Sequence, residues 1–75
     1  MKTNFKNANG DLSRYALACG YVQKREVSPG IEVSLWREHG VYHVRAHDFE
    51  NGRRVFWRSG KLTECRKIYR KGIPA

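Results

Sequence analysis

Hydrophobic and polar residues alternate along the middle of the chain, where glycine-containing turns separate short segments. Three segments are rich in Val, Ile, Tyr, Phe and Trp: Ile31–Glu38, Val41–Phe49 and Arg53–Arg58. Alternation with this composition is typical of β-strands. His39-Gly40 and Asn51-Gly52 lie between them, and such dipeptides favour two-residue hairpin turns because glycine readily adopts a positive φ. We therefore predict three antiparallel strands connected as a meander.

The hydrophobic period changes in the last segment, where one side of a helix would carry Leu62, Cys65, Ile68 and Tyr69. Ser59 is the predicted N-cap, and Gly72 followed by Pro74 is the predicted end of this helix. The predicted fold class is α+β, with a three- to four-stranded antiparallel β-meander and one C-terminal helix packed on one face. We expect one small domain over residues 1–75, with residues 1–10 flexible.

Residues 11–27 fit two structures. Asp11 can cap a short helix that ends at Gly20. The stretch from Tyr15 to Gln23 also alternates, and it can form a fourth strand that pairs with Ile31–Glu38 through a Ser-Pro-Gly turn. The pattern favours the strand, but both structures stay open.

The two-residue turns also predict which side chains share a face, because successive side chains of a strand alternate. They place Trp36 opposite His43, Arg45 opposite Arg58, and Ala46 opposite Trp57. The face beneath the helix would carry Val33, Leu35, Tyr42, Val44, Ala46, Val55 and Trp57. The face that the helix does not cover, called the open face below, would carry Ser34, Trp36, His43, Arg45, His47, Arg54, Phe56 and Arg58.

The charge balance points to an anionic partner. The chain has 15 Lys and Arg against 7 Asp and Glu, a formal net charge of +8, and its aromatic content of 12% is high for a disordered basic tail. Arginine suits phosphate, and aromatic rings can stack on bases. We therefore predict a nucleic-acid-binding protein, with DNA or RNA as its partner. The residues predicted to bind are Trp36, His43, Arg45, Arg54, Phe56 and Arg58 on the open face, with Lys61, Arg66, Lys67 and Arg70 on the helix.

Other interpretations of the open face stay open. Its aromatic and arginine side chains could anchor an acidic protein surface, as in a phage-encoded inhibitor or adaptor. It could instead be a second small core, covered by the N-terminal segment through Phe5, Tyr15 or Leu17. The chain could be a monomer, or a homodimer formed through an edge strand.

Catalytic and metal chemistry find little support in the sequence. The acidic residues form no convincing catalytic pair, and there is no C-x-x-C motif and no glycine-rich phosphate loop, so we expect a non-enzymatic protein without cofactor or metal. Cys19 and Cys65 are expected to be reduced and buried, the alternative being one disulfide between them. No apolar run approaches the ~20 residues that span a bilayer, and no secretory leader is seen. The expected location is cytoplasmic, with no membrane partner.

Three resemblances fit this outline. The stretch from Trp36 to Arg45, continued by that from Lys61 to Lys67, is similar to the AP2-like arm-binding modules of phage and transposon integrases. That resemblance implies a sheet laid into a DNA groove. If Asp11–Gly20 is helical, the element order also resembles a double-stranded RNA-binding domain. The stretches Tyr15–Tyr21 and Tyr42–Arg45 resemble small basic proteins of phages and mobile elements.

Overall fold

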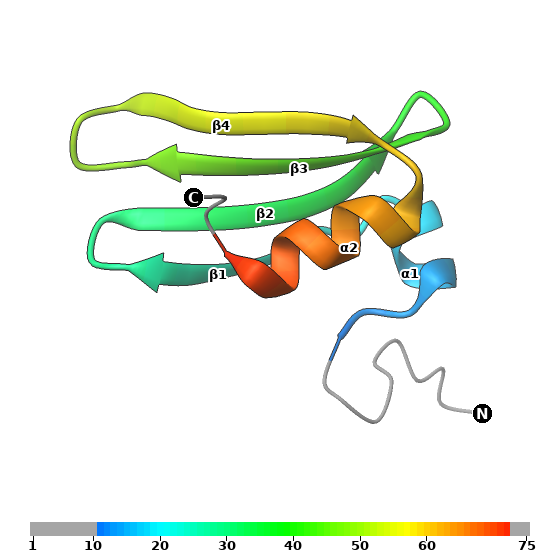
Figure 1. Ribbon diagram of the computed structural model, residues 1–75. Helices are drawn as coiled ribbons and strands as arrows, with labels where there is room; N and C mark the ends of the chain where they lie inside the picture. The colour runs from blue at the N-terminus through cyan, green and yellow to red at the C-terminus, as the bar shows by residue number, and fades with distance from the viewer. Residues whose placement is uncertain (1–10, 73–75) are drawn as a thin grey trace.

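The computed structural model describes residues 11–72. Its elements, in chain order, are α1 (Arg14–Ala18), β1 (Gln23–Ser28), β2 (Ile31–Glu38), β3 (Val41–Asp48), β4 (Arg53–Gly60) and α2 (Leu62–Lys71). The strands form one antiparallel sheet in the order β1-β2-β3-β4, and α2 runs along it (Figure 1). This confirms the predicted meander with a C-terminal helix. The prediction for residues 1–10 and the role given to Pro74 lie outside the described residues.

Residues 11–27 form both a helix and a strand. Ser13 caps α1, because its Oγ accepts a hydrogen bond from the Ala16 N–H at 3.1 Å. Asp11, the cap in the helical alternative, instead accepts hydrogen bonds from the Gln23 side chain and from Arg70, both at 3.0 Å. The favoured strand is therefore wrong in its first part, where α1 forms, but the fourth strand itself is confirmed: β1 begins at Gln23 and pairs with β2 through the Ser-Pro-Gly turn.

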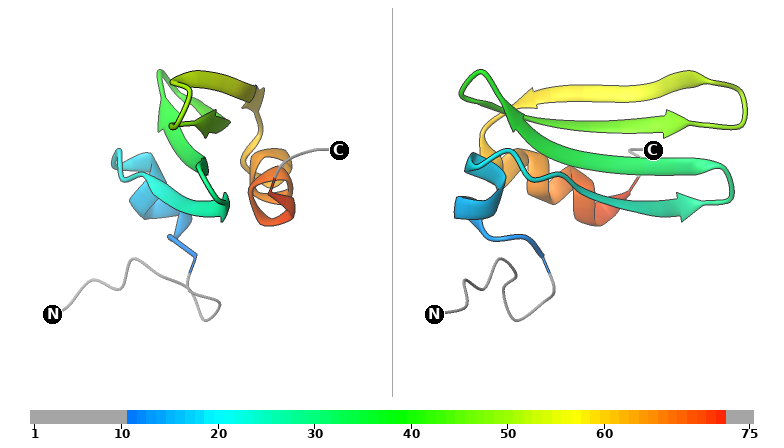
Figure 2. Two further views of the ribbon diagram at one scale, coloured as in Figure 1. Left: turned by 90° about the vertical axis from the view of Figure 1, so that its left-hand side faces the viewer. Right: turned by 180° about the vertical axis from the view of Figure 1, so that it is seen from behind.

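The core lies between the sheet and the two helices. Its buried members are Leu17, Val33, Leu35, Val44, Ala46, Cys65 and Tyr69. In the end-on view the sheet is curved and α2 lies on its concave side (Figure 2, left). The predicted helix stripe is confirmed, since Leu62 and Ile68 pack against this core beside the buried Cys65 and Tyr69. The N-cap is Lys61 rather than Ser59, because β4 continues to Gly60.

The turn between β3 and β4 is longer than predicted. Asp48 pairs with Arg53, which leaves the four residues 49–52 in the loop. The Asp48 carboxylate holds this loop by accepting hydrogen bonds from the Glu50 and Asn51 N–H groups, both at 3.1 Å, and from the Asn51 side chain at 2.7 Å. The two-residue turn at His39-Gly40 is confirmed, since Glu38 pairs with Val41.

A β-bulge in β4 then reverses the faces of the residues that follow it. His47 pairs with Arg54 but Ala46 pairs with Phe56, so Val55 is an extra residue in β4. One inserted residue turns every later side chain of a strand to the opposite face. The predicted pairs of Ala46 with Trp57 and of Arg45 with Arg58 are therefore wrong.

The bulge exchanges residues between the two faces. Arg45 pairs with Trp57, which moves Trp57 from the helix side to the open face. Phe56 and Arg58, predicted for the open face, lie on the helix side, where Phe56 packs against the core. Val55, predicted to lie beneath the helix, is 44% exposed.

Candidate functional site

Three aromatic rings stack across three strands of the open face. The ring centroids of Trp36 and His43 are 5.3 Å apart with an interplanar angle of 18°, and those of His43 and Trp57 are 5.8 Å apart at 17°. The sheet register produces this arrangement, because Trp36 and His43 are direct partners and Trp57 is a diagonal neighbour of His43. We call these three residues the ring stack.

An arginine lies over each terminal ring of the ring stack. The guanidinium carbon of Arg45 is 5.4 Å from the Trp36 centroid, and that of Arg54 is 5.6 Å from the Trp57 centroid. Both distances fall within the ~6 Å over which a cation is attracted to a ring face. Both arginines are exposed, so each guanidinium can also bind an anion that approaches from solvent.

The ring stack is accessible to solvent at the β4 edge of the sheet. Trp57 is 46% exposed, whereas Trp36 and His43 are half-buried. The view from behind shows the strands of this face with α2 on their far side (Figure 2, right). His43 Nδ1 is buried and, among the described residues, has no hydrogen-bond partner. Trp57 is the ring of the stack that is most exposed to solvent, with Arg54 lying over it.

A hollow of about 340 Å³ lies beside Trp36 on the same face. It is lined by Val22, Lys24, Glu32, Ser34, Trp36 and Arg45. Ser34 is only 6% exposed and Trp36 is half-buried, whereas Lys24 and Arg45 are exposed. The open face thus combines stacked rings, two cations and one carboxylate around a concave surface.

The structure brings together four of the predicted binding residues and separates the others. Trp36, His43, Arg45 and Arg54 share the open face, and Trp57 joins them although the sequence pattern placed it in the core. The missed residue had no local signal, because nothing in the sequence around Val55 marks a bulge. The guanidinium carbon of Arg58 lies 5.7 Å from the Phe56 centroid, on the other side of the sheet.

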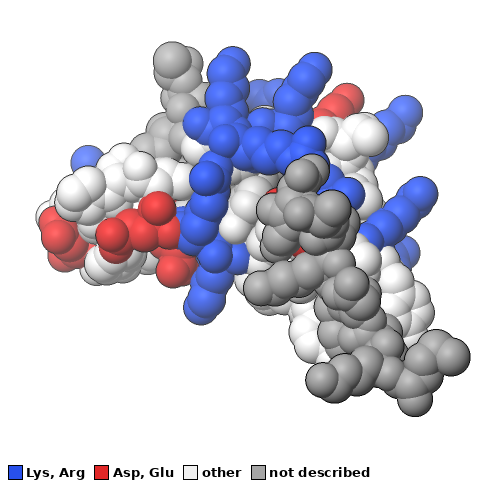
Figure 3. Space-filling view, turned by 90° about the horizontal axis from the view of Figure 1, so that it is seen from below, with Lys and Arg blue, Asp and Glu red and all other residues white. Residues whose placement is uncertain are grey.

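Three of the predicted helix cations, Arg66, Lys67 and Arg70, line one hollow along α2, whereas Lys61 is the N-cap of this helix. Seen from below, Lys and Arg side chains gather across the middle of this side of the molecule (Figure 3). Two of these arginines have structural partners. Arg66 donates to the Leu12 carbonyl, and Arg70 donates to Asp11, which lowers the pKa of that carboxyl group. Lys61 and Lys67 are exposed.

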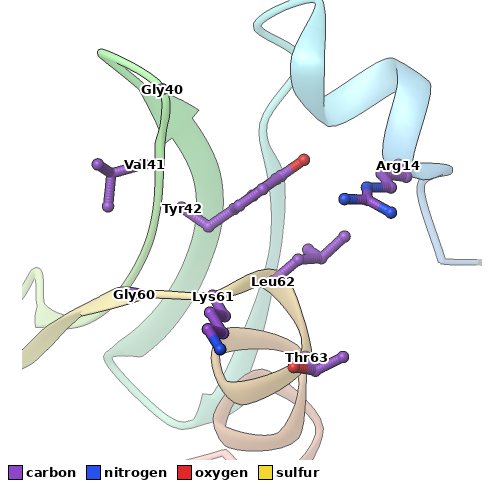
Figure 4. Close-up of a pocket in the computed structure, with 8 residues that line it drawn as sticks. All are labelled: Arg14, Gly40, Val41, Tyr42, Gly60, Lys61, Leu62 and Thr63. Carbon is purple, nitrogen blue, oxygen red and sulfur yellow. The ribbon is translucent and has the colours of Figure 1, made fainter.

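The helix side also carries a hollow of about 580 Å³ at the junction of β3, β4 and α2. Figure 4 shows the Tyr42 hydroxyl and the Arg14 side chain directed toward one another across it, with Leu62 between Tyr42 and Thr63. Its remaining lining residues are Gly40, Val41, Gly60, Lys61 and Thr63. The walls are largely apolar, with a cation at two positions.

The covering of the open face by the N-terminal segment finds no support in the described residues. Leu17 belongs to the core on the helix side, and Tyr15 is 65% exposed. Phe5 lies outside the described part of the chain. Phe56, predicted for the open face, packs against the main core instead.

Both cysteines are free. Cys65 is buried, and burial raises the pKa of its thiol. Cys19 is exposed, so the expectation that both would be buried is wrong for Cys19. No three His, Cys, Asp or Glu side chains between residues 11 and 72 are grouped so as to hold a metal ion. Within the same range, neither helix is long and apolar enough to cross a bilayer.

Comparisons of the chain with protein-family models, with curated proteins and with solved structures gave no match.

Proposed function

We propose that this protein is a non-enzymatic nucleic-acid-binding protein that uses the open face. The observation that carries the proposal is the ring stack with Arg45 and Arg54 over its terminal rings. A base that displaces the Arg54 guanidinium from the exposed Trp57 ring would extend the stack, and the displaced guanidinium would then be free to contact a phosphate. Stacking of this kind is tolerant of sequence, because every base has a π-face.

The same arrangement favours a single strand over a duplex. Bases within a duplex are already stacked on their neighbours, so an aromatic side chain can stack only on unpaired or displaced bases. A sheet that reads a duplex groove contacts base edges mainly through polar side chains. On the open face, the indole ring of Trp57 is exposed at the sheet edge beside Arg54. A cytoplasmic location and a phage or mobile-element origin stay predictions of the sequence.

A salt titration tests this proposal. Anisotropy of fluorescently labelled single-stranded and duplex DNA and RNA is measured from about 50 to 300 mM salt, a range in which phosphate contacts strongly affect affinity. For single strands, log Kd changes with log salt by about 0.7 per phosphate contact. We expect Arg54→Ala to reduce the slope by about this amount.

Arg58→Ala is the matched control. It removes the same charge from the same strand, but from the helix side of the sheet. We expect its salt slope to equal that of the unmodified protein. Equal losses in the two variants would contradict binding through the open face. Absence of binding to every DNA and RNA at about 50 mM salt, where such contacts are strong, would contradict nucleic-acid binding altogether.

The second candidate is an acidic protein partner. The observation that favours it is the hollow on the helix side, whose apolar wall includes Tyr42 and Leu62 and whose cations are Arg14 and Lys61. Such a surface suits an apolar side chain flanked by carboxylates. This candidate predicts that Arg14→Ala and Lys61→Ala weaken partner binding, whereas Trp57→Ala does not.

A further inference from the structure

We propose that the hollow beside Trp36 selects guanine in the bound single strand. This inference rests on the proposed function and specifies the ligand of the same face. The hollow has about 340 Å³, which is within the usual range for small-ligand sites, and it continues the surface of the ring stack. Trp36 belongs to both, so a base in the hollow can contact the indole.

Glu32 is the acidic residue in the lining of this hollow. Lys24 and Arg45 also line it, yet none of the ion pairs within residues 11–72 includes the Glu32 carboxylate. Its partners in the sheet are Glu26 on β1 and His47 on β3. A carboxylate on a surface that binds a polyanion opposes the phosphates, unless it accepts hydrogen bonds from the base.

Guanine is the base whose donors match a carboxylate best. Its Watson–Crick edge carries two adjacent N–H donors, the ring N1–H and the 2-amino group, which can meet the two oxygens of Glu32 in parallel. Adenine and cytosine offer one amino group beside a ring nitrogen that accepts. Thymine and uracil offer one N–H between two carbonyls, which would repel the second carboxylate oxygen. Unpaired bases in single strands are commonly recognised through this edge.

The cations of the hollow can bind the backbone of the same nucleotide. Lys24 and Arg45 line the hollow with Glu32, and both are exposed. If a guanine forms hydrogen bonds with Glu32, the phosphate of the same nucleotide would lie close to the charged groups of Lys24 and Arg45. Carboxylate, indole and cations together describe a guanine nucleotide site rather than a general anion site.

The test uses nine-nucleotide thymidine strands that carry one central dG, deoxyinosine, dA or dC. We expect the dG strand to bind about tenfold more tightly than the dA and dC strands, as is usual for one bidentate base contact. Deoxyinosine lacks the 2-amino group, so its strand should lose most of this advantage. Glu32→Gln replaces one acceptor by a donor, and we expect the preference for dG to disappear.

Glu26→Gln is the matched control. Glu26 is the direct partner of Glu32 across the β1–β2 pair, but it does not line the hollow. Both variants remove one negative charge, so both should bind the dA and dC strands slightly more tightly. Glu26→Gln should keep the preference for dG, whereas Glu32→Gln should bind the dG strand more weakly than the unmodified protein does. Far-UV circular dichroism of each variant establishes that it is folded.

The outcomes separate this inference from the proposed function. If all strands bind equally, or if Glu32→Gln keeps the preference for dG, the function stands and guanine selection is wrong. If no strand binds, the proposed function is wrong. A parallel titration with GMP then decides about the hollow. If GMP binds and the binding requires Glu32, the hollow is a site for a free nucleotide. If GMP does not bind either, recognition of guanine is wrong both for strands and for free nucleotides.

Discussion

The bulge in β4 exchanges the positions of Phe56 and Trp57 between the core and the open face. Without the bulge, Phe56 would lie on the open face and Trp57 in the core. In the structure, Trp57 is 46% exposed and stacked on His43, whereas Phe56 packs against the core. We therefore expect Trp57→Ala to impair binding and Phe56→Ala to impair stability.

The magnitudes follow from these two environments. Replacing a buried aromatic residue by alanine costs about 3–5 kcal/mol, so the half-buried Phe56 should contribute about 2–3 kcal/mol to the free energy of unfolding. Trp57 contributes a ring contact at the surface, worth about 1 kcal/mol. For binding, one base stacked on an aromatic ring is worth about 1–3 kcal/mol, so Trp57→Ala should raise Kd about tenfold or more.

Two measurements on the same pair of variants test this expectation. Urea unfolding followed by far-UV circular dichroism gives the stability, because that signal comes mainly from the backbone and the midpoint can be compared between variants. Anisotropy with a labelled single strand gives Kd under conditions in which both variants are folded. The reasoning is refuted if Phe56→Ala weakens binding as much as Trp57→Ala, or if Trp57→Ala is the more destabilised variant.

Three further predictions concern single features of the fold. Hydrogen bonds from Asn51 and Glu50 lower the pKa of Asp48 from its ordinary value of 3.8. The ionised Asp48 carboxylate therefore stabilises the folded state fully above pH 3.8, and this contribution is lost as the pH falls below that value. Asp48→Asn should flatten the acid limb of a stability–pH profile, and an unchanged limb would contradict this role. A thiol reagent should modify the exposed Cys19 in the folded protein, whereas the buried Cys65 should react only as urea unfolds the chain, and equal native rates would contradict the packing. Gly30→Ala should destabilise by at least about 1 kcal/mol, because φ is +81° and the new Cβ would lie 2.7 Å from Glu50 Cδ. Adding Glu50→Ala should recover part of this loss in a double-mutant cycle, and a fully additive result would exclude the clash.

Much of the fold follows from local pattern. Alternation predicted β2, β3 and most of β4, the His39-Gly40 turn predicted the register of β2 with β3, and the period near 3.6 predicted the buried side of α2. For this reason Trp36, His43 and Arg45 were placed on one face correctly. Each of these features depends on residues that are close in the sequence.

The ambiguity of residues 11–27 has a different origin. Five helical residues are too few to show a convincing period, and isolated helices of this length are unstable in water. What stabilises α1 is the burial of Ala16 and Leu17, the latter in the shared core, together with the Ser13 cap. The hydrogen bonds of Asp11 to Gln23 and Arg70 also join segments that only the folded chain brings together.

Local pattern determines which segments are strands and which is the long helix, because the spacing of apolar residues and the choice of turn residues act over a few positions. Tertiary structure alone decided which face receives Trp57. The four-residue loop held by Asp48 and the extra residue Val55 set the register of β4, and side chains alternate with a period of two, so one inserted residue exchanged a core position for a surface one. This register is a property of the β3–β4 pairing, which joins residues that the turn dipeptide alone would pair differently.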